Sequence, residues 1–339
     1  MMSTERAGEG LKPGKVPPEV LARLLAIPRE SCEDVLVAPA PGEDAAVLRS
    51  HAGRMVVTSD PITFPTPRPG HFAVCVNAND IAAMGGRPRF FTMTLMMPPG
   101  SSSEAILSIV QDAIESGSRQ GIILIGGHTE VTAAVQWPVV SVAMLGDLVS
   151  PEPLRTGGAC PGDALLQVGC LALEGTAILA AEHGERLTAV LGADLVRQAL
   201  GRLEDPGISV VGPALRLAAS DGVHALHDPT EGGLATGLRE MAESAGLGVR
   251  VDAGRLLRLP ETEPICRVVG MDPLGLIASG CLLAAVTAEA ASALAADLRS
   301  CGYAAAVVGH FTSDPALVLC EAGGERPLPR FGVDELARS

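Results

Sequence analysis

Apolar positions in the first half of the chain form short runs that alternate with segments of helical period. Runs of about five apolar residues favour buried strands, whereas apolar residues three and four positions apart favour helices. Strands are therefore predicted at 44–49, 54–59, 90–97, 121–126 and 138–146, and helices at 17–24, 71–84 and 101–118. From residue 44 onward, the order strand, strand, helix, strand, helix, strand, strand predicts one sheet with helices covering it.

The second half repeats this alternation after a connection that is rich in proline and glycine. The connection spans residues 150–162, and we place a domain boundary there. Further strands are predicted at 163–169, 222–226, 248–252, 280–286 and 305–309. Further helices are predicted at 174–183, 189–201, 211–220, 231–245 and 288–301.

These elements predict an α/β fold of the α+β kind in two domains. We expect an N-terminal extension, a first domain, a second domain and a tail at residues 1–40, 41–150, 160–320 and 321–339. The length of 339 residues agrees with about two domains, and a hydrophobic content of 47% suffices for two sizeable cores. Disordered and disulfide-stapled classes of protein are excluded.

The charge pattern excludes several kinds of partner. A net charge of −14 argues against sequence-independent binding of nucleic acids, which requires a basic surface. No run reaches the ~18 uncharged apolar residues of a membrane span. Charged residues and prolines interrupt the first thirty positions, unlike a signal peptide. We therefore expect a cytoplasmic protein with neither a membrane nor a nucleic-acid partner.

Two residue types narrow the chemistry further. Lysine occurs only at Lys12 and Lys15, so a Walker loop, a kinase strand lysine and a Schiff-base lysine are absent from the rest of the chain. A phosphorylated substrate would then be neutralised by metal ions, backbone amides and arginines. The eight cysteines are scattered without a CxxC pair, which predicts reduced thiols.

Carboxylates and an amide mark the ends of predicted elements in the first half. Asp44 stands at the start of one strand and Asp60 ends another, while Asn77 and Asp80 share one face of a helix. Mg²⁺ binds carboxylate oxygens together with substrate phosphates, so Asp44, Asp60 and Asp80 would form a magnesium site if the fold brings them together. The alternative is that they are ordinary turn, strand-end and surface residues.

Two glycine-rich segments follow predicted strands. The first is a predicted turn that consists of Gly126, Gly127, His128 and Thr129. The second leads into a helix, where free backbone amides can receive a phosphate, and contains Asp228, Thr230, Gly232 and Gly233. His224 and His227 precede it, but no cysteine or further histidine is close to them in the sequence, which argues against a zinc site. Glu174 also opens a helix and fits a simple cap.

Four motifs in this order resemble those of one superfamily. They are Gly-Glu-Asp-Ala-Ala-Val at 42–47, Thr-Ser-Asp at 58–60, Asn-Asp-Ile-Ala-Ala-Met-Gly-Gly at 79–86 and Gly-Gly-His-Thr at 126–129. They are similar to the GDDAA turn, the TTD strand end, the (N/S)DIAAMG helix and the GGDT/GGHT turn of the aminoimidazole-ribotide (AIR) synthetase-related, or PurM-like, superfamily. The similarity covers roughly residues 35–310. Asp-Pro-Thr-Glu-Gly-Gly-Leu-Ala at 228–235 further resembles its HypE-like, hydrogenase-maturation group.

The resemblance implies a fold, a cofactor and an assembly. The first domain would be ferredoxin-like and would pair with a second copy in a homodimer, and the second would be of the PurM C-terminal type. ATP would lie near the dimer interface, with Mg²⁺ held by Asp44, Asp60 and Asp80. The residues that the resemblance assigns to the nucleotide are Asn77, Gly126, Gly127, His128, Thr129, Asp228, Thr230 and Gly232.

The chain departs from the HypE-like group at three points. The C-terminal cysteine of that group is missing, because the last cysteine here is Cys320 and the chain ends Asp-Glu-Leu-Ala-Arg-Ser. His128 stands where the group has a metal-binding aspartate. The acidic residue that the group carries near Ser279 is absent as well.

The implied function is Mg·ATP-dependent activation, by phosphorylation, of an oxygen on a small substrate or on a group of a protein partner. One alternative is a small-molecule kinase of the thiamine-phosphate type, which the Asp-Ile-Ala-Ala-Met-Gly-Gly motif favours. Another is a non-catalytic maturation or regulatory partner that keeps the dimeric scaffold, which the missing cysteine and His128 favour. The motifs assign no catalytic residue.

Overall fold

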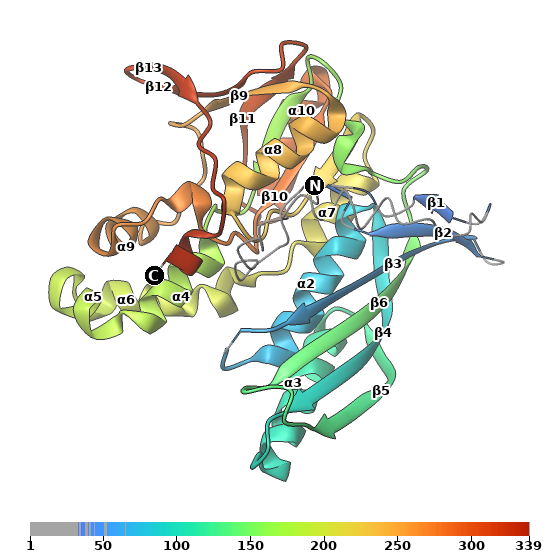
Figure 1. Ribbon diagram of the computed structural model, residues 1–339. Helices are drawn as coiled ribbons and strands as arrows, with labels where there is room; N and C mark the ends of the chain where they lie inside the picture. Colours follow the sequence, from blue (N-terminus) through green and yellow to red (C-terminus); the bar gives the residue numbers. More distant parts are fainter. Residues whose placement is uncertain are drawn as a thin grey trace, which may run out of the picture.

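The structure, a computed structural model, describes residues 33, 35–37, 40, 42–43, 45–50, 53–64 and 66–338. Asp44, the helix predicted at 17–24 and most of the expected N-terminal extension lie outside these residues. The described chain forms two sheets, each with helices packed on it (Figure 1). This confirms the predicted α+β fold of two domains.

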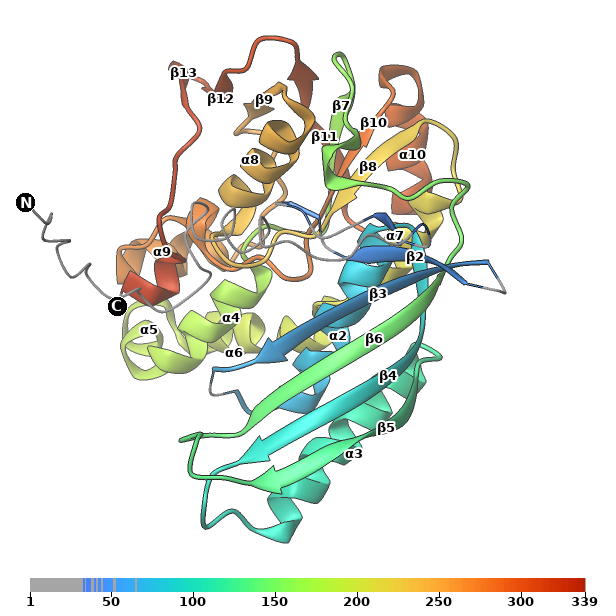
Figure 2. The ribbon, with the colours of Figure 1, turned by 45° about the vertical axis from the view of Figure 1, so that its right-hand side comes forward.

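The first sheet has six strands in the spatial order β1-β2-β3-β6-β4-β5. They are β1 (Val35–Val37), β2 (Ala46–Ser50), β3 (Gly53–Ile62), β4 (Gly86–Met97), β5 (Ile123–Val131) and β6 (Val139–Leu148). Only β4 and β5 are parallel neighbours in this sheet, within the described residues. Helices α2 (Pro69–Ala83) and α3 (Ser103–Arg119) lie behind the sheet in Figure 2, and no described helix covers its other face.

The two helices on this sheet differ in burial. Almost every residue of α2 is buried, because the sheet, α3 and α7 (Val211–Ala218) surround it. A helix that is apolar on all sides is typical of such a central position. In contrast, α3 is amphipathic, and the hydroxyl of Ser102 caps it by accepting a hydrogen bond from the N–H of Ala105 at 3.1 Å.

The second sheet has seven strands in the order β13-β12-β9-β11-β7-β10-β8. They are β7 (Ala164–Val168), β8 (Val223–His227), β9 (Gly248–Asp252), β10 (Leu282–Val286), β11 (Ala305–Thr312), β12 (Leu317–Glu321) and β13 (Gly324–Pro327). The remaining α-helices are α4 (Leu173–Glu182), α5 (Gly184–Leu191), α6 (Ala193–Gly201), α8 (Gly233–Ala245), α9 (Thr262–Val269) and α10 (Ala288–Ser300).

Helices cover the second sheet on both faces. α7 and α10 pack on one face, and α4, α8 and α9 pack on the other. Every residue of β7 and β10 is consequently buried. This double cover explains why β10 appears in the sequence as a continuous apolar run without alternation, and why Gln167 is the one polar residue of β7.

Most predicted elements are present, with a few informative errors. The order of strands and helices from β2 to β6 is the predicted one. The turn predicted at Gly126-Gly127 is wrong, because β5 continues through it to Val131. The single helix predicted at 189–201 is also wrong, because Gly192, with φ +90°, separates α5 from α6. The short elements β1, α9, β12 and β13 were not predicted.

Helix α2 joins the two domains. The buried apolar residues of the first sheet, of α2 and of one face of the second sheet form one continuous core. Asn79 lies within this core, where its Nδ2 donates to the carbonyl oxygen of Ile208 at 2.9 Å and its Oδ1 accepts from the N–H of Val210 at 2.8 Å. One buried amide therefore fixes α2 to the segment that leads into α7.

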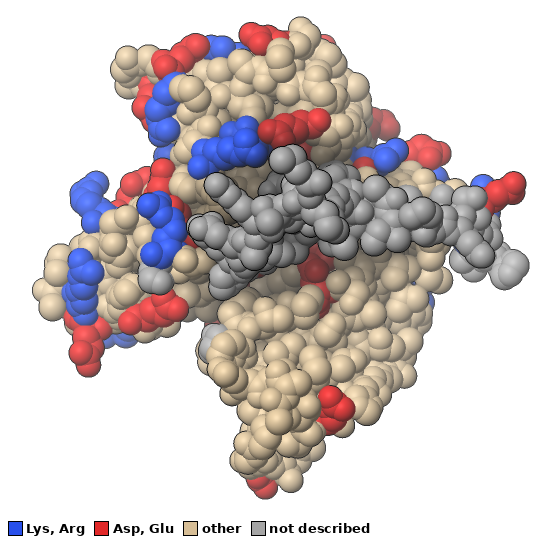
Figure 3. All heavy atoms as spheres, viewed as in Figure 1, with Lys and Arg blue, Asp and Glu red and all other residues tan. Residues whose placement is uncertain are grey.

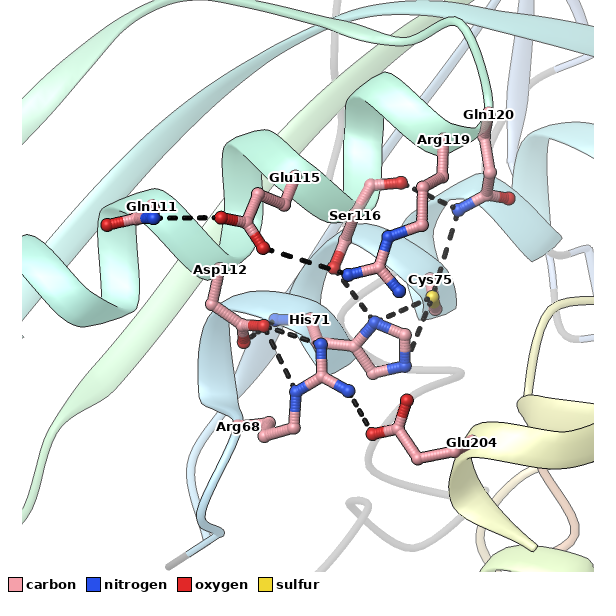
Figure 4. A network of polar contacts seen from close by, with 10 residues as sticks. All are labelled: Arg68, His71, Cys75, Gln111, Asp112, Glu115, Ser116, Arg119, Gln120 and Glu204. Atoms are coloured by element: carbon pink, nitrogen blue, oxygen red, sulfur yellow. Dashed lines mark hydrogen bonds and ion pairs between the residues drawn. The ribbon is translucent and has the colours of Figure 1, made fainter.

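A polar network holds the first turn of α2 against α3 and the second domain (Figure 4). Arg68 pairs with Asp112 of α3 at 2.6 Å and with Glu204 of the second domain. The N–H of His71 donates to Asp112 at 2.8 Å, and its Nδ1 lies 2.9 Å from the hydroxyl of Ser116. Burial, with the neighbouring Arg68, lowers the pKa of His71, so its ring is neutral at pH 7.

The cysteines of the described residues are unpaired, as the sequence predicts. Cys75, Cys266 and Cys281 are buried, whereas Cys160 and Cys301 are exposed. Burial raises the pKa of Cys75 and of Cys266 to about 12, which excludes a thiolate at either position at pH 7. None of the described helices combines the length and apolar character that a membrane span requires.

Candidate functional site

A buried asparagine fastens the end of β3 to α2. The Oδ1 of Asn77 accepts a hydrogen bond from the N–H of Asp60 at 2.8 Å, and its Nδ2 donates to the carbonyl oxygens of Asp60 and Ala73 at 3.0 and 2.8 Å. These bonds compensate for the complete burial of the Asn77 amide. Asp60 is thereby held at a defined position on α2 while remaining exposed.

Asp80 lies one helical turn beyond Asn77. Its Oδ2 accepts a hydrogen bond from the hydroxyl of Thr58 at 2.8 Å, and the residue is only 6% exposed. Thr58 and Asp60 are two positions apart on β3, so both point to the face of the sheet that α2 covers. The structure therefore brings Asp60 and Asp80 to the same β3–α2 contact, and their role as metal ligands stays a prediction.

The acidic turn before β2 meets the second domain. Oε1 of Glu43 accepts a hydrogen bond from Nε of Arg155 at 3.1 Å. Gly42 has φ +81°, and a Cβ there would collide with the hydroxyl of Ser244 on α8. Gly42 and Glu43 thus both contact the second domain, whereas Asp44 lies outside the described residues.

The second glycine-rich segment forms a rigid turn between β8 and α8. Asp228 is 4% exposed, and the carbonyl oxygen of Thr230 accepts hydrogen bonds from the N–H groups of Gly233 and Ala278 at 3.1 and 3.2 Å. Gly232 and Gly233 have φ +79° and +66°, which favours glycine at both positions. β8, which leads to this turn, also packs against α2, the helix that carries Asn77 and Asp80.

The N-terminus of α8 binds a carboxylate of this same chain. The N–H of Gly232 donates to Oδ2 of Asp334 at 2.7 Å, just before the short helix η4 (Glu335–Arg338). Burial raises the pKa of Asp334 to about 6, although hydrogen bonds from the N–H groups of Leu336 and Gly232 oppose this rise. The amide of Gly232 thus donates to a carboxylate of this chain, and its role toward a phosphate stays a prediction.

The first glycine-rich segment lies in the exposed edge strand β5. Gly126, Gly127, His128 and Thr129 are all exposed. Nε2 of His128 lies 3.4 Å from Oε2 of Glu130, two residues along the strand. A Cβ at Gly127 would collide with the carbonyl oxygen of Met93 on β4, whereas Gly126 has open space.

The predicted site residues fall into two groups. β6 and β4 lie between β3 and β5, so about 14 Å separates the two strands at ~4.8 Å for each strand spacing. Asp60, Asn77 and Asp80 lie at the β3–α2 contact, and the turn at 228–233 follows β8, which packs against α2. The segment at 126–129 is distant from them within one chain.

The structure adds one carboxylate for which the sequence predicted only a cap. Glu174, in the first turn of α4, is 1% exposed, and its Oε2 has no hydrogen-bond partner among the described residues. Burial raises its pKa to about 7. The nearby hydroxyl of Ser279 lowers that pKa, although its position falls short of a hydrogen bond. The apolar residues around Glu174 in the sequence are the signal that it is buried.

Comparisons with known proteins identify the scaffold. Residues 42–148 match the model for the N-terminal domain of AIR synthase related proteins, and residues 160–319 match the model for their C-terminal domain. The carbamoyl dehydratase HypE of Rhodobacter capsulatus is 32% identical over 280 residues, which cover 80% of this chain and 79% of that protein. This chain belongs to the AIR synthase-related family.

A further relative and two solved structures are similar to this chain over most of its length. A putative hydrogenase expression/formation protein of Methanocaldococcus jannaschii is 28% identical over 288 residues, or 82% of each chain. The crystal structure of a HypE–HypF complex contains a chain with a TM-score of 0.74 and 24% identity, covering 86% of this chain and 94% of that one. A ThiL complexed with AMPPCP and TMP has a TM-score of 0.72 and 16% identity over 93% of this chain and 94% of that one.

The family models cover most of the candidate site but not all of it. The matched ranges contain the β3–α2 contact, the segment at 126–129 and the turn at 228–233. Asp334 lies beyond the matched residues 160–319. The carboxylate on the amide of Gly232 thus comes from a segment that the family models do not include.

Proposed function

We propose that this AIR synthase-related protein is a Mg·ATP-dependent enzyme that phosphorylates an oxygen on a small substrate or on a group carried by a protein partner. The observation that carries this proposal is the β3–α2 contact, where an exposed Asp60 and a nearly buried Asp80 accompany the buried Asn77. β8, which packs against α2, leads to the N-terminus of α8, where the N–H of Gly232 donates to a carboxylate.

The donor set fits magnesium. Carboxylate oxygens are the protein ligands that Mg²⁺ prefers, and it retains further positions for phosphate oxygens. Asp60 and Asp80 would hold the ion, together with Asp44 of the preceding acidic turn. When bound, the ion would neutralise phosphate charge that the acidic chain would otherwise repel. With few lysines in the sequence, this neutralisation cannot come from a P-loop cation.

A solved structure of similar fold supports ATP as the cofactor. One solved structure is described as the hydrogenase maturation protein HypE in complex with ATP; it has a TM-score of 0.73 and 22% identity over 96% of this chain and 98% of that one. We infer the same cofactor here. Asn77 would shape the site through its hold on Asp60, and Asp228, Thr230 and Gly232 would face the phosphates. The domain boundaries at 41–150 and 160–320 are part of this proposal.

A homodimer would complete the site. β5 exposes Ile123, Ile125 and Val131, and the part of the surface formed by the first sheet carries few charged side chains in Figure 3. An apolar edge of this kind is typical of an interaction surface. A second copy that covers it would take Gly126, Gly127, His128 and Thr129 out of solvent and supply them to a nucleotide at the interface.

Calorimetric titration of ATP tests the proposal. We expect binding by the wild-type protein that depends on Mg²⁺ and is lost in Asp60→Asn. Asp194→Asn, which changes an exposed carboxylate on α6, is the matched control and should bind as the wild type does. A folded protein that binds no ATP in either condition would contradict the proposal.

A second candidate is a non-catalytic partner that keeps the scaffold. The contact between Asp334 and Gly232 favours it, because a carboxylate already occupies the amide that a phosphate would use. ATP binding without turnover, in the presence of candidate acceptors, would support this second function. ATP-dependent phosphorylation of an acceptor would exclude it.

A further inference from the structure

A tight turn ahead of β7 holds a cysteine next to an aspartate. In the sequence Cys160-Pro161-Gly162-Asp163, the N–H of Asp163 donates to the carbonyl oxygen of Cys160 at 3.1 Å, and the N–H of Cys160 donates to Oδ2 of Asp163 at 2.8 Å. Gly162 has φ +93°, which fits the proline–glycine pair at the corner of such a turn. The two side chains are therefore fixed by their own backbone.

The turn is anchored to the second sheet. The N–H of Gly162 donates to the carbonyl oxygen of Phe311 on β11 at 3.0 Å, and the N–H of Phe311 donates to that of Asp163 at 2.8 Å. The preceding Gly158 packs so closely on β8 that a Cβ would collide with the carbonyl oxygen of His224. This backbone contact brings the turn next to the first residues of β8.

His224 completes a group of three different ligand types. Its Nδ1 lies 2.8 Å from Oδ2 of Asp163, and one ligand atom each of Cys160, Asp163 and His224 lies within 4.8 Å of the other two. Cys160 is exposed, His224 is partly exposed and Asp163 is buried. The group is thus accessible to an ion from solvent while its aspartate is fixed.

We propose that Cys160, Asp163 and His224 bind a thiophilic divalent cation, with zinc as the reference ion. Thiolate, imidazole and carboxylate are the three protein ligands of Zn²⁺, and three of them leave a fourth position for water or another ligand. The hydrogen bond from the N–H of Cys160 to Asp163 orients the carboxylate, as outer-shell contacts do in metal sites.

This site is separate from the proposed nucleotide site in place and in chemistry. His224 lies in β8 and Asp228 directly follows this strand, so the two are four residues apart, or about 13 Å of extended chain. Asp60 and Asp80 offer only oxygen ligands, whereas this group offers sulfur and nitrogen. A bound ion would cross-link the connection between the domains to β8.

The sequence argued against zinc here for an understandable reason. His224 and His227 look like a pair, but they are three positions apart on a strand and point to opposite faces. Nε2 of His227 instead lies 2.9 Å from Oε2 of Glu240 on α8. The actual neighbours of His224 are about sixty residues earlier in the chain, as the separation of 61 from Asp163 records.

Cobalt titration tests the site directly, because a cobalt–thiolate bond gives a charge-transfer absorption band that oxygen ligands do not give. After treatment with a chelator, we expect the wild-type protein to develop this band at one equivalent of Co²⁺ and to lose it on adding Zn²⁺. Cys160→Ser should abolish the band, and His224→Ala should weaken cobalt binding by at least about tenfold.

Two controls separate this site from other metal binding. Cys301→Ser changes another exposed cysteine and should leave the band unchanged, as should Asp60→Asn at the proposed magnesium site. A wild-type protein without the band, or a band that persists in Cys160→Ser, would overturn the proposal. Failure of ATP binding would leave this result unaffected, since the two sites share no residue.

Discussion

Two glycine pairs of this protein, at 126–127 and 232–233, have the same composition and opposite surroundings. Gly126-Gly127 lies in the exposed edge strand β5, and its side of the strand is open to solvent or to another protein. Gly232-Gly233 lies in a left-handed turn at the start of α8, where the carboxylate of Asp334 accepts the first N–H. A glycine pair in the sequence thus indicates backbone without covering side chains. The tertiary structure decides whether solvent, another protein or a carboxylate of the same chain contacts that backbone.

The largest expected effect is on the free energy of unfolding and separates the two glycines of β5. Gly127→Ala should destabilise the protein by about 3 kcal/mol, because its Cβ would collide with backbone of β4 that cannot move without breaking strand pairing. Gly126→Ala has open space and should change the free energy of unfolding little. Urea denaturation of both variants measures the difference, and equal stabilities would refute the close approach of β4 to Gly127.

The next largest expected effect is on the pH dependence of stability and concerns Glu174, which lies in the same domain as the second glycine pair. Its pKa is raised to about 7, so the stability that it contributes is fully present below its ordinary pKa of 4.5 and is lost as pH rises through about 7. Glu174→Gln cannot ionise and should be more stable than the wild type at pH 8 by about 2 to 3 kcal/mol, with little difference at pH 4.5.

Denaturation curves across this pH range measure the effect. Glu182→Gln, at the exposed end of the same helix, is the matched control and should follow the wild-type profile. Parallel pH profiles for the wild type and Glu174→Gln would contradict a raised pKa at position 174.

A charge on β5 tests what covers the first glycine pair. Ile125 is 57% exposed next to Gly126, and Ile125→Asp should weaken self-association by at least about tenfold, because the carboxylate would be buried in the interface. Leu107→Asp alters a similarly exposed residue on α3 and should leave the association unchanged. Sedimentation velocity over a concentration series measures both, and a wild-type monomer would contradict the homodimer.

The smallest expected effect is on the affinity for ATP and concerns Asp334, whose carboxylate accepts a hydrogen bond from the second glycine pair. Asp334→Ala frees the N–H of Gly232, and ATP binding should strengthen by about two- to fivefold at pH 8, the usual contribution of one charge at a helix N-terminus. Since the pKa of Asp334 is raised to about 6, the advantage should shrink at pH 5, where the wild-type carboxyl group is neutral. Unchanged or weaker binding at pH 8 would show that Asp334 does not compete with the phosphates.

The parts of the fold that were predictable have local causes. Ser102 begins α3 as a helix-capping serine does, and the uninterrupted apolar run of β10 identifies a strand that is covered on both faces. The turn predicted at Gly126-Gly127 failed, because pairing with β4 keeps these glycines extended against their own preference.

The candidate site also divides into residues that local patterns reveal and residues that only tertiary contacts reveal. Asp60, Asn77 and Asp80 were identified because polar residues within apolar elements need partners, and β3 and α2 are close in the sequence. Asn79 was the exception: its partners near Ile208 lie about 130 residues later, as separations of 129 and 131 record, and no local pattern reveals them.

The sequence by itself determined the two-domain α+β scaffold, the family and the residues available to bind metal and phosphate, because helical and strand periods and motif spacing are local properties. The tertiary structure alone decided that Asp334 reaches Gly232, that Glu174 is buried beside Ser279 and that Cys160 and Asp163 meet His224. These contacts join segments about 60 to 105 residues apart, as separations of 61 and 102 illustrate. Only the folded chain fixes which polar groups are taken out of water together.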